Sequence, residues 1–308
     1  MAVTTHETEA RSGQAARAAR NAAVRRWRGR LARIARHTAA VVIAVIFLVP
    51  LFWMLTGSLK SNADIFKFPP SLWPAHPQWS NYPRALTYIP FWRYLGNSAI
   101  VSACTVLGTL LACVMAAYAF SIMRWRGREA MFAVSLGLIL LPFPVVMIPL
   151  YVIFRHLGWI GSLAPLLVPP FGAQFITPYF SSALAIFLLR QFFRSLPRSL
   201  IEAARLDGAG NWTVLRKVVI PLSRGPLITV VILTFLTSWT AFIGPLIFIN
   251  NQSDFTLSLG LEQYQSSHFT AYNYLMAASL VFMIPTLILF VVAQRHLIRG
   301  VAFSGLKN

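Results

Sequence analysis

The charged residues that could make a specific contact gather in one segment, 201-IEAARLDGAGNWTVLRKVVIPL-222, which lies between two long apolar runs. Its acids are Glu202 and Asp207. No catalytic set accompanies them: the sequence has no metal-spaced cluster of His, Cys, Asp and Glu, no nucleophile with a plausible base, and no GxxxxGK[ST] phosphate loop. We therefore expect contact chemistry rather than catalysis, with no enzymatic activity and no metal or cofactor bound by this chain.

The first half of this segment has the pattern of a short helix. Ser199 and Glu202 have the spacing of a capping box, in which each side chain bonds the other residue's backbone N–H. The helix is expected to run from there to about Asp207. Gly208 then suits the left-handed position that ends many helices.

The second half predicts another helix, over residues 212–219, with a turn and cap at 210–211 and a stop at Pro221. The two small side chains of Ala203 and Ala204 on the first helix permit close approach of another surface. Pattern alone leaves two interpretations open. The segment either docks into a partner or lies as an amphipathic helix on the membrane surface.

Composition indicates the membrane. Of the 308 residues, 57% are hydrophobic and only 11% are charged, whereas soluble domains carry about a quarter charged residues. A helix needs roughly 20 apolar residues to cross the hydrocarbon. The stretches without Asp, Glu, Lys or Arg that reach this length are 38–59, 94–123, 130–154, 156–189, 225–253 and 269–294. We therefore predict an all-α membrane protein with six transmembrane helices.

Two of these stretches contain helix breakers. The fourth is interrupted by Pro169, Pro170, Gly172 and Pro178, so part of it is expected to be a loop or re-entrant. In the fifth, the pair Gly244-Pro245 is expected to break the helix.

The positive charges predict the orientation. The N-terminal segment 1–37, the C-terminal segment and the segments after the second and fourth stretches hold 22 of the 27 Lys and Arg residues. The positive-inside rule then places both termini in the cytoplasm of a bacterial cell. The net charge of +19 is thus mainly a topology signal, although the Arg/Ala-rich tail 1–37 could also lie on anionic lipid. No nucleic-acid partner is expected. Residues 38–308 would form the spanning domain.

The predicted spans contain no ionisable Asp, Glu, Lys or Arg, and all six His lie at or beyond their ends. Ion-driven transporters commonly use intramembrane carboxylates or His relays. A stand-alone secondary transporter is therefore disfavoured, although a Na⁺ site built from carbonyls and hydroxyls stays open. Uphill transport would need energy from a partner that docks on the cytoplasmic side.

An aromatic stripe marks the fifth stretch. Phe235, Trp239 and Phe242 follow at i, i+4 and i+7 and share one helical face. With the Thr240 hydroxyl nearby, they could line a path for a sugar. A packing stripe between helices is the commoner use of such a pattern. The charge-free spans favour a neutral solute over an anion.

The segment 201–222 resembles the EAA loop of the membrane subunits of bacterial ABC importers. That motif is Glu-Ala-Ala, three residues, Gly, nine residues, an aliphatic, one residue and an aliphatic-Pro pair. Here its members are Glu202-Ala203-Ala204, Gly208, Val218 and Ile220-Pro221. Residues 45–308 resemble carbohydrate-importer permeases of the MalG-like type, with PLFW at 50–53 and SWTAF at 238–242 among the matching stretches. Residues 170–187 are longer than usual for that family, and 1–37 match nothing characteristic of it.

The resemblance implies a MetI-like permease fold and a carbohydrate substrate. It implies that the loop at about 195–222, hereafter the EAA-like loop, sits in a cleft of a cytoplasmic ATPase. The residues that would couple to the ATPase are Glu202, Ala203, Ala204, Asp207, Gly208 and Pro221. The partners would be a second related permease, two ATP-binding subunits that hold ATP and Mg²⁺, and an extracytoplasmic solute-binding protein. The alternatives are a glycerol phosphate or polyol importer, a stand-alone transporter, and a membrane scaffold without transport.

Overall fold

A computed structural model describes residues 3–137, 140, 142–169, 183–265 and 270–304. Every regular element in these residues is helical, and the β-type pairing consists of one isolated antiparallel bridge between Gln265 and Thr270. The predicted all-α fold is confirmed. Pro170, Gly172 and Pro178, which were expected to interrupt the fourth span, lie outside the described residues, as does the start of the sixth predicted span.

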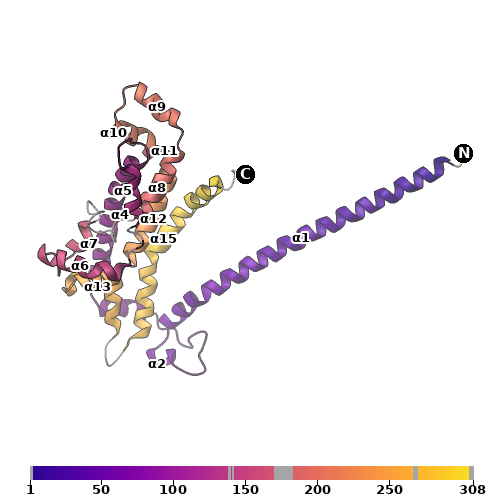
Figure 1. Cartoon of the computed structure of the whole chain (residues 1–308). Coiled ribbons are helices and arrows are strands. Elements are labelled where there is room, and N and C mark those ends of the chain that lie inside the picture. The colour runs from indigo at the N-terminus through magenta and orange to yellow at the C-terminus, as the bar shows by residue number, and fades with distance from the viewer. Residues whose placement is uncertain (1–2, 138–139, 141, 170–182, 266–269, 305–308) are drawn as a thin grey trace.

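The chain runs through long helices joined by short ones (Figure 1). The long helices are α1 (Val3–Ser58), α4 (Phe91–Ser121), α12 (Arg224–Trp239) and α15 (Tyr272–Ser304). The helices of intermediate length are α3 (Asn81–Tyr88), α5 (Arg128–Gly137), α6 (Phe143–His156), α8 (Ala183–Ser195) and α9 (Arg198–Leu206). The shortest are α2 (Asn62–Ile65), α7 (Ala164–Leu167), α10 (Asn211–Val214), α11 (Ile220–Leu222), α13 (Ile243–Phe248) and α14 (Leu257–Gly260).

Three helical segments of the described chain are long and apolar enough to cross a membrane: Leu31–Ser58, Phe91–Ser121 and Tyr272–Gln294. They correspond to the first, second and sixth predicted spans. The third and fifth stretches are each divided, between α5 and α6 and between α12 and α13. The break expected at Gly244-Pro245 comes earlier, at residues 240–242, between the end of α12 at Trp239 and the start of α13 at Ile243. Pro245 instead occupies the first turn of α13, where its missing N–H leaves no helical bond unmade.

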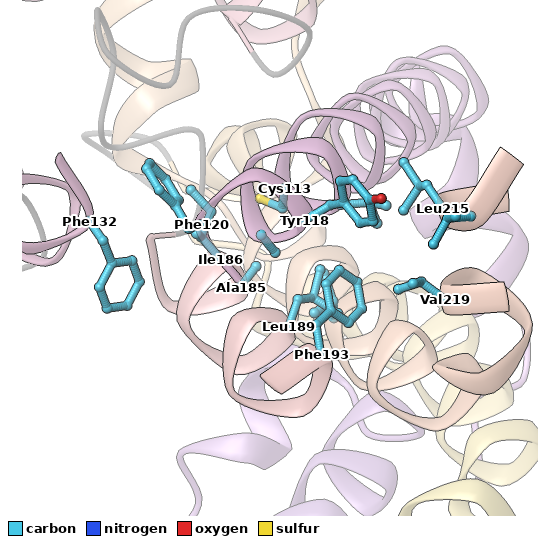
Figure 2. Packing of buried hydrophobic residues seen from close by; sticks show 14 of the residues in the cluster. Cys113, Tyr118, Phe120, Phe132, Ala185, Ile186, Leu189, Phe193, Leu215 and Val219 are labelled. Atoms are coloured by element: carbon cyan, nitrogen blue, oxygen red, sulfur yellow. The ribbon is translucent and has the colours of Figure 1, made fainter. Parts of the chain in front are cut away.

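Helix α4 is the centre of the packed region, with α8 and α12 against its sides. Its buried residues join those of α5, α8 and the EAA-like loop in one apolar cluster. Figure 2 shows Leu215 and Val219 of the loop on the same side as Tyr118, with Phe132 of α5 at the far end. The loop is therefore built into the same core as the spanning helix.

A buried asparagine fixes the opposite end of the chain. Asn81 of α3 is 1% exposed, and its amide donates to the carbonyls of Ser58 and Lys60, each at 2.8 Å. Its own Oδ1 accepts from Asn273 of α15 at 3.3 Å. These bonds join the end of α1 to α3 and α15. The rest of α1 extends away from the other helices, and residue 37, the predicted end of the tail, falls inside it (Figure 1).

Candidate functional site

The first helix of the EAA-like loop begins at a proline. The N-cap of α9 is Pro197, and no side chain caps the helix. The predicted capping box of Ser199 and Glu202 is therefore wrong. Proline holds φ near −65°, and the observed φ of −58° and ψ of 121° at Pro197 lead the chain into the helix two residues before the expected start. Ser199 thus lies inside the first turn of α9.

Gly208 ends α9 as predicted. Its φ is +82°, in the left-handed region that glycine enters without a steric penalty. Its N–H donates to the carbonyl of Arg205 at 3.0 Å, and the N–H of Ala209 donates to the carbonyl of Ala204 at 2.9 Å. This pair of bonds is the Schellman motif, which satisfies the last carbonyls of a helix.

Helix α9 has a packed side and an open side. Ile201 is buried, and Ala204 is half-buried against the apolar cluster of α4 and α8. On the other side, Ala203 is exposed between Leu200 and Leu206, and Leu206 is 90% exposed. An apolar helical face with a small residue at its centre can receive another helix or a groove edge at close distance.

The second half of the EAA-like loop continues further than predicted. It runs through α10, a π-helical turn at Leu215–Val219 and α11, so Pro221 lies inside the helical segment, which ends at Leu222. The bend follows at Ser223, where the axis turns by 81° into α12. Proline and π-turns are the usual sites of helix bends. The loop thus leads directly into the apolar helix α12.

Asn211 ties the two halves of the loop to α4. It is the first residue of α10 and has Gly210 as its N-cap. Its Oδ1 accepts from the hydroxyl of Tyr118 at 3.3 Å and from the guanidinium of Arg205 at 3.4 Å. A movement of α9 would therefore reach α4 through Asn211 as well as through the apolar cluster.

A buried arginine holds α4, α5 and α8 together beside this loop. Arg190 is 3% exposed, although it stands one residue beyond the predicted charge-free span. Its Nε donates to the carbonyl of Phe120 at 3.0 Å, its guanidinium pairs with Glu129, and it stacks 3.8 Å over the ring of Phe132. Local desolvation raises the pKa of Glu129, but hydrogen bonds and charge from Arg128 and Arg190 outweigh it and place that pKa below its usual range.

A second candidate region is a cavity between α4 and α12 of about 350 Å³. None of the described residues that line it is charged, and six carry a hydroxyl: Thr105, Thr109, Thr234, Thr237, Ser238 and Thr256. Thr109 is fully buried, and within the described residues its Oγ1 has no hydrogen-bond partner. Buried hydroxyls are nearly always paired. Thr109 thus stands in the wall of the cavity with a hydroxyl that the described residues leave unpaired.

The aromatic stripe lies in helix packing. Trp239 is 3% exposed, its indole N–H donates to the carbonyl of Phe282 at 3.0 Å, and its ring stacks with Phe235 and Phe282. Thr240 is exposed and donates to the carbonyl of Leu236, and Phe242 is half-buried. These residues do not line the hydroxyl cavity, which uses the neighbouring face of α12.

Sequence reasoning missed the threonine cavity and Arg190. Thr105 and Thr109 stand four residues apart in an apolar helix, as do Thr234 and Ser238. The helical spacing of these hydroxyl side chains inside charge-free spans was the sequence signal that could have indicated the cavity. No group of three or more His, Cys, Asp or Glu side chains among the described residues is placed to hold a metal.

Residues 105–303 match the family described as the binding-protein-dependent transport system inner membrane component. The chain belongs to this family, and within it to the MalG-like type of permease, so the identification from the loop motif is confirmed. It is 32% identical over 268 residues to the diacetylchitobiose uptake system permease protein NgcG of Streptomyces coelicolor, with 86% of each chain covered. It is 31% identical over 273 residues to the sulfoquinovosyl glycerol transport system permease protein SmoH of Agrobacterium fabrum, covering 89% of this chain and 93% of that protein.

The fold has a counterpart among crystal structures. It matches one chain of a bacterial ABC transporter involved in the import of the acidic polysaccharide alginate, with a TM-score of 0.74 and 24% sequence identity. The match covers 86% of this chain and 96% of that chain. The predicted permease fold is confirmed.

Proposed function

We propose that this chain is the permease subunit of an ATP-driven importer in a bacterial plasma membrane and that it carries a neutral carbohydrate. The observation that carries the proposal is the arrangement of α9. Its inner face packs into the core of α4 and α8, and its outer apolar face is open. An external force on the open face would reach the helix that lines the hydroxyl cavity.

The energy would come from two ATP-binding subunits that bind ATP with Mg²⁺, one of which would dock on this face. Ala203 on the open face would permit close packing of the ATPase, and Ala204 permits close packing of α9 on the core of this chain. Glu202 and Asp207, both exposed, would face polar groups of the ATPase. Gly208 would set the turn behind the helix. Pro221 would add to the bend through which movement of the loop reaches α12.

The transport cycle would be alternating access. Closure of the two ATPases on ATP would shift α9, and the tie through Asn211 and Tyr118 would carry the shift to α4. The cavity between α4 and α12 would then open to one side of the membrane and close to the other. A second, related permease would form the other wall of the path, and an extracytoplasmic solute-binding protein would deliver the solute.

The lining of the cavity supports a neutral carbohydrate. Sugar hydroxyls can exchange hydrogen bonds with its Thr and Ser hydroxyls. A phosphate or another anion would lose its hydration without a cation to compensate on this chain's side, which is costly. The names of NgcG, a diacetylchitobiose uptake permease, and SmoH, a sulfoquinovosyl glycerol transport permease, agree with a sugar-like solute. The sulfoquinovosyl group is anionic, so the proposal of a neutral solute rests on the cavity lining alone.

The topology belongs to the same proposal. We assign six spans within residues 38–308, with both termini and the EAA-like loop in the cytoplasm and residues 1–37 as a cytoplasmic tail. The three long apolar helices supply the first, second and sixth spans. The third, fourth and fifth would be built from the pairs α5–α6, α7–α8 and α12–α13.

The test is uptake in cells that express the chain with its genomic neighbours. Labelled neutral oligosaccharides, polyols and glycerol phosphate are compared, with Thr109→Val and Thr234→Val as cavity variants. Each lost hydroxyl contact is expected to lower sugar uptake by about two- to tenfold. Thr229→Val on α12 is the control, because Thr229 bonds only the carbonyl of Gly225 and does not line the cavity. Saturable uptake of glycerol phosphate that sugars do not compete with would reject the carbohydrate assignment.

A further inference from the structure

A second cavity of about 350 Å³ lies beneath α9, between the ends of α4 and α8. Its lining is strongly basic. The charged residues around it are Arg124, Arg128, Arg194, Arg198, Arg205 and Glu202. The remaining lining residues include Ile122 and the buried Phe193 and Ile201, which form an apolar floor.

Three of these arginines have no hydrogen-bond or ion-pair partner among the residues that the structure describes. Arg128 pairs with Glu129 and donates to the carbonyl of Met123, and Arg205 donates to Asn211. Among the described residues, none makes a hydrogen bond or ion pair with Arg124, Arg194 or Arg198. Their guanidinium groups are left to a ligand from outside or to solvent.

The cavity carries an excess of positive charge, which favours the binding of an anion. Five guanidinium groups face it and Glu202 supplies one carboxylate. Like charges that share a cleft repel each other, and they raise the local concentration of counter-ions. Arginine also presents a planar fork of donors that matches phosphate oxygens in a bidentate manner. An oxyanion with several acceptor atoms fits this set better than a monovalent ion without hydrogen-bond geometry.

The position of the cavity indicates where the anion comes from. Ser121, the last residue of the apolar helix α4, lines the cavity, and the exposed Trp125 follows four residues later. Tryptophan and arginine at the end of a spanning helix mark the level of the lipid headgroups. Basic pockets between spanning helices on the cytoplasmic side suit anionic headgroups. The apolar floor would also accept the first methylenes of an acyl chain.

We propose that this cavity is a binding site for a phosphate-bearing anion and that an anionic phospholipid of the membrane supplies it. The phosphodiester would lie among Arg124, Arg194 and Arg198, under α9. The bound headgroup would reduce the repulsion among the arginines and hold α9 against the ends of α4 and α8. The inference rests on the proposed topology, which places this end of α4 on the cytoplasmic side of the membrane, and not on the docking of an ATPase.

The test uses the full-length chain purified with its partner subunits. Native mass spectrometry measures binding of phosphatidylglycerol, phosphatidylcholine and inorganic phosphate to the wild type and to the double variant Arg124→Gln/Arg194→Gln. The double variant is expected to bind phosphatidylglycerol about 30-fold more weakly, at about fivefold for each arginine. The control is Arg155→Gln/Arg216→Gln, which removes the same charge from exposed arginines that do not line the cavity. It is expected to bind within about twofold of the wild type.

A measurement on the wild type guards against misfolding of the variant. A photoreactive phosphatidylglycerol should cross-link to the peptides around 121–128 and 194–205, and phosphatidylcholine should displace it poorly. Equal binding of phosphatidylglycerol and phosphatidylcholine would overturn the site. Displacement of the lipid by millimolar inorganic phosphate would overturn its lipid source. Loss of the ATPase with unchanged lipid binding in Arg124→Gln/Arg194→Gln would assign the arginines to an acidic protein contact instead.

Discussion

Replacement of Gly208 by alanine isolates the turn that ends α9. No atom lies within 4 Å of the position a Cβ would take, so the substitution causes no clash. Its cost is the left-handed φ of +82°, which for a residue with a Cβ is about 1–2 kcal/mol. That free energy should appear as easier opening of the two capping bonds made by the N–H groups at 208 and 209.

The assay is hydrogen exchange of these two amides in the purified complex. A loss of 1–2 kcal/mol corresponds to exchange about 5–30-fold faster at both positions. Gly208→Asn should recover part of the protection, because asparagine tolerates the left-handed region better than alanine does. The matched control is Gly210→Ala, which also meets nothing within 4 Å but stands at φ −70°. Equal acceleration in both alanine variants, or none in Gly208→Ala, would refute the role assigned to the turn.

Three further substitutions test the packing that positions the sites. Gly260→Ala would place a Cβ onto the buried Tyr94 ring, and overpacking of about 1–3 kcal/mol should lower the thermal midpoint of the complex. Asn81→Ala removes the donors to two carbonyls at the end of α1 and should cost about 2–3 kcal/mol in the free energy of unfolding by denaturant. Glu129→Gln should weaken the contact with Arg190 at neutral pH. Because the pKa of Glu129 is lowered in the folded state, the contribution of its carboxylate is present above the usual carboxyl range and is lost as pH falls through the lowered value. The thermal midpoints of wild type and Glu129→Gln should therefore converge at acid pH and differ at pH 7; a constant difference across that range would contradict the assignment.

The sequence predicted features that depend on local chemistry. Gly208 was assigned to the left-handed turn because glycine is the residue that enters it at least cost, and the structure has φ +82° there. The capping box failed for a local reason as well, because Pro197 already starts α9 and places Ser199 inside the helix. Long apolar helices could also be predicted, because the length of the charge-free stretches indicates helices as long as α4 and α15.

Features that depend on tertiary packing could not be predicted from the sequence. Which face of α12 lines the cavity depends on how the helix is rotated against α4. The sequence of α12 offers both an aromatic face and a threonine face, and its pattern does not distinguish between them. Arg190 looked like the first residue of a cytoplasmic loop, yet Glu129 and the carbonyl of Phe120, about 60 and 70 positions away in sequence, allow it to be buried. The basic cavity likewise combines arginines from three separate segments, so no single motif marks it.

The central claim is that the open face of α9 receives the ATPase. The most direct measurement is the amount of ATP-binding subunit that co-purifies with the chain when Ala203, exposed at the centre of that face, is changed to tryptophan. The control is Thr87→Trp, an equally bulky change at an exposed site on α3. We expect Ala203→Trp to lose most of the ATPase, with uptake falling in parallel, and Thr87→Trp to retain it. Full retention of the ATPase and of uptake in Ala203→Trp would contradict the account.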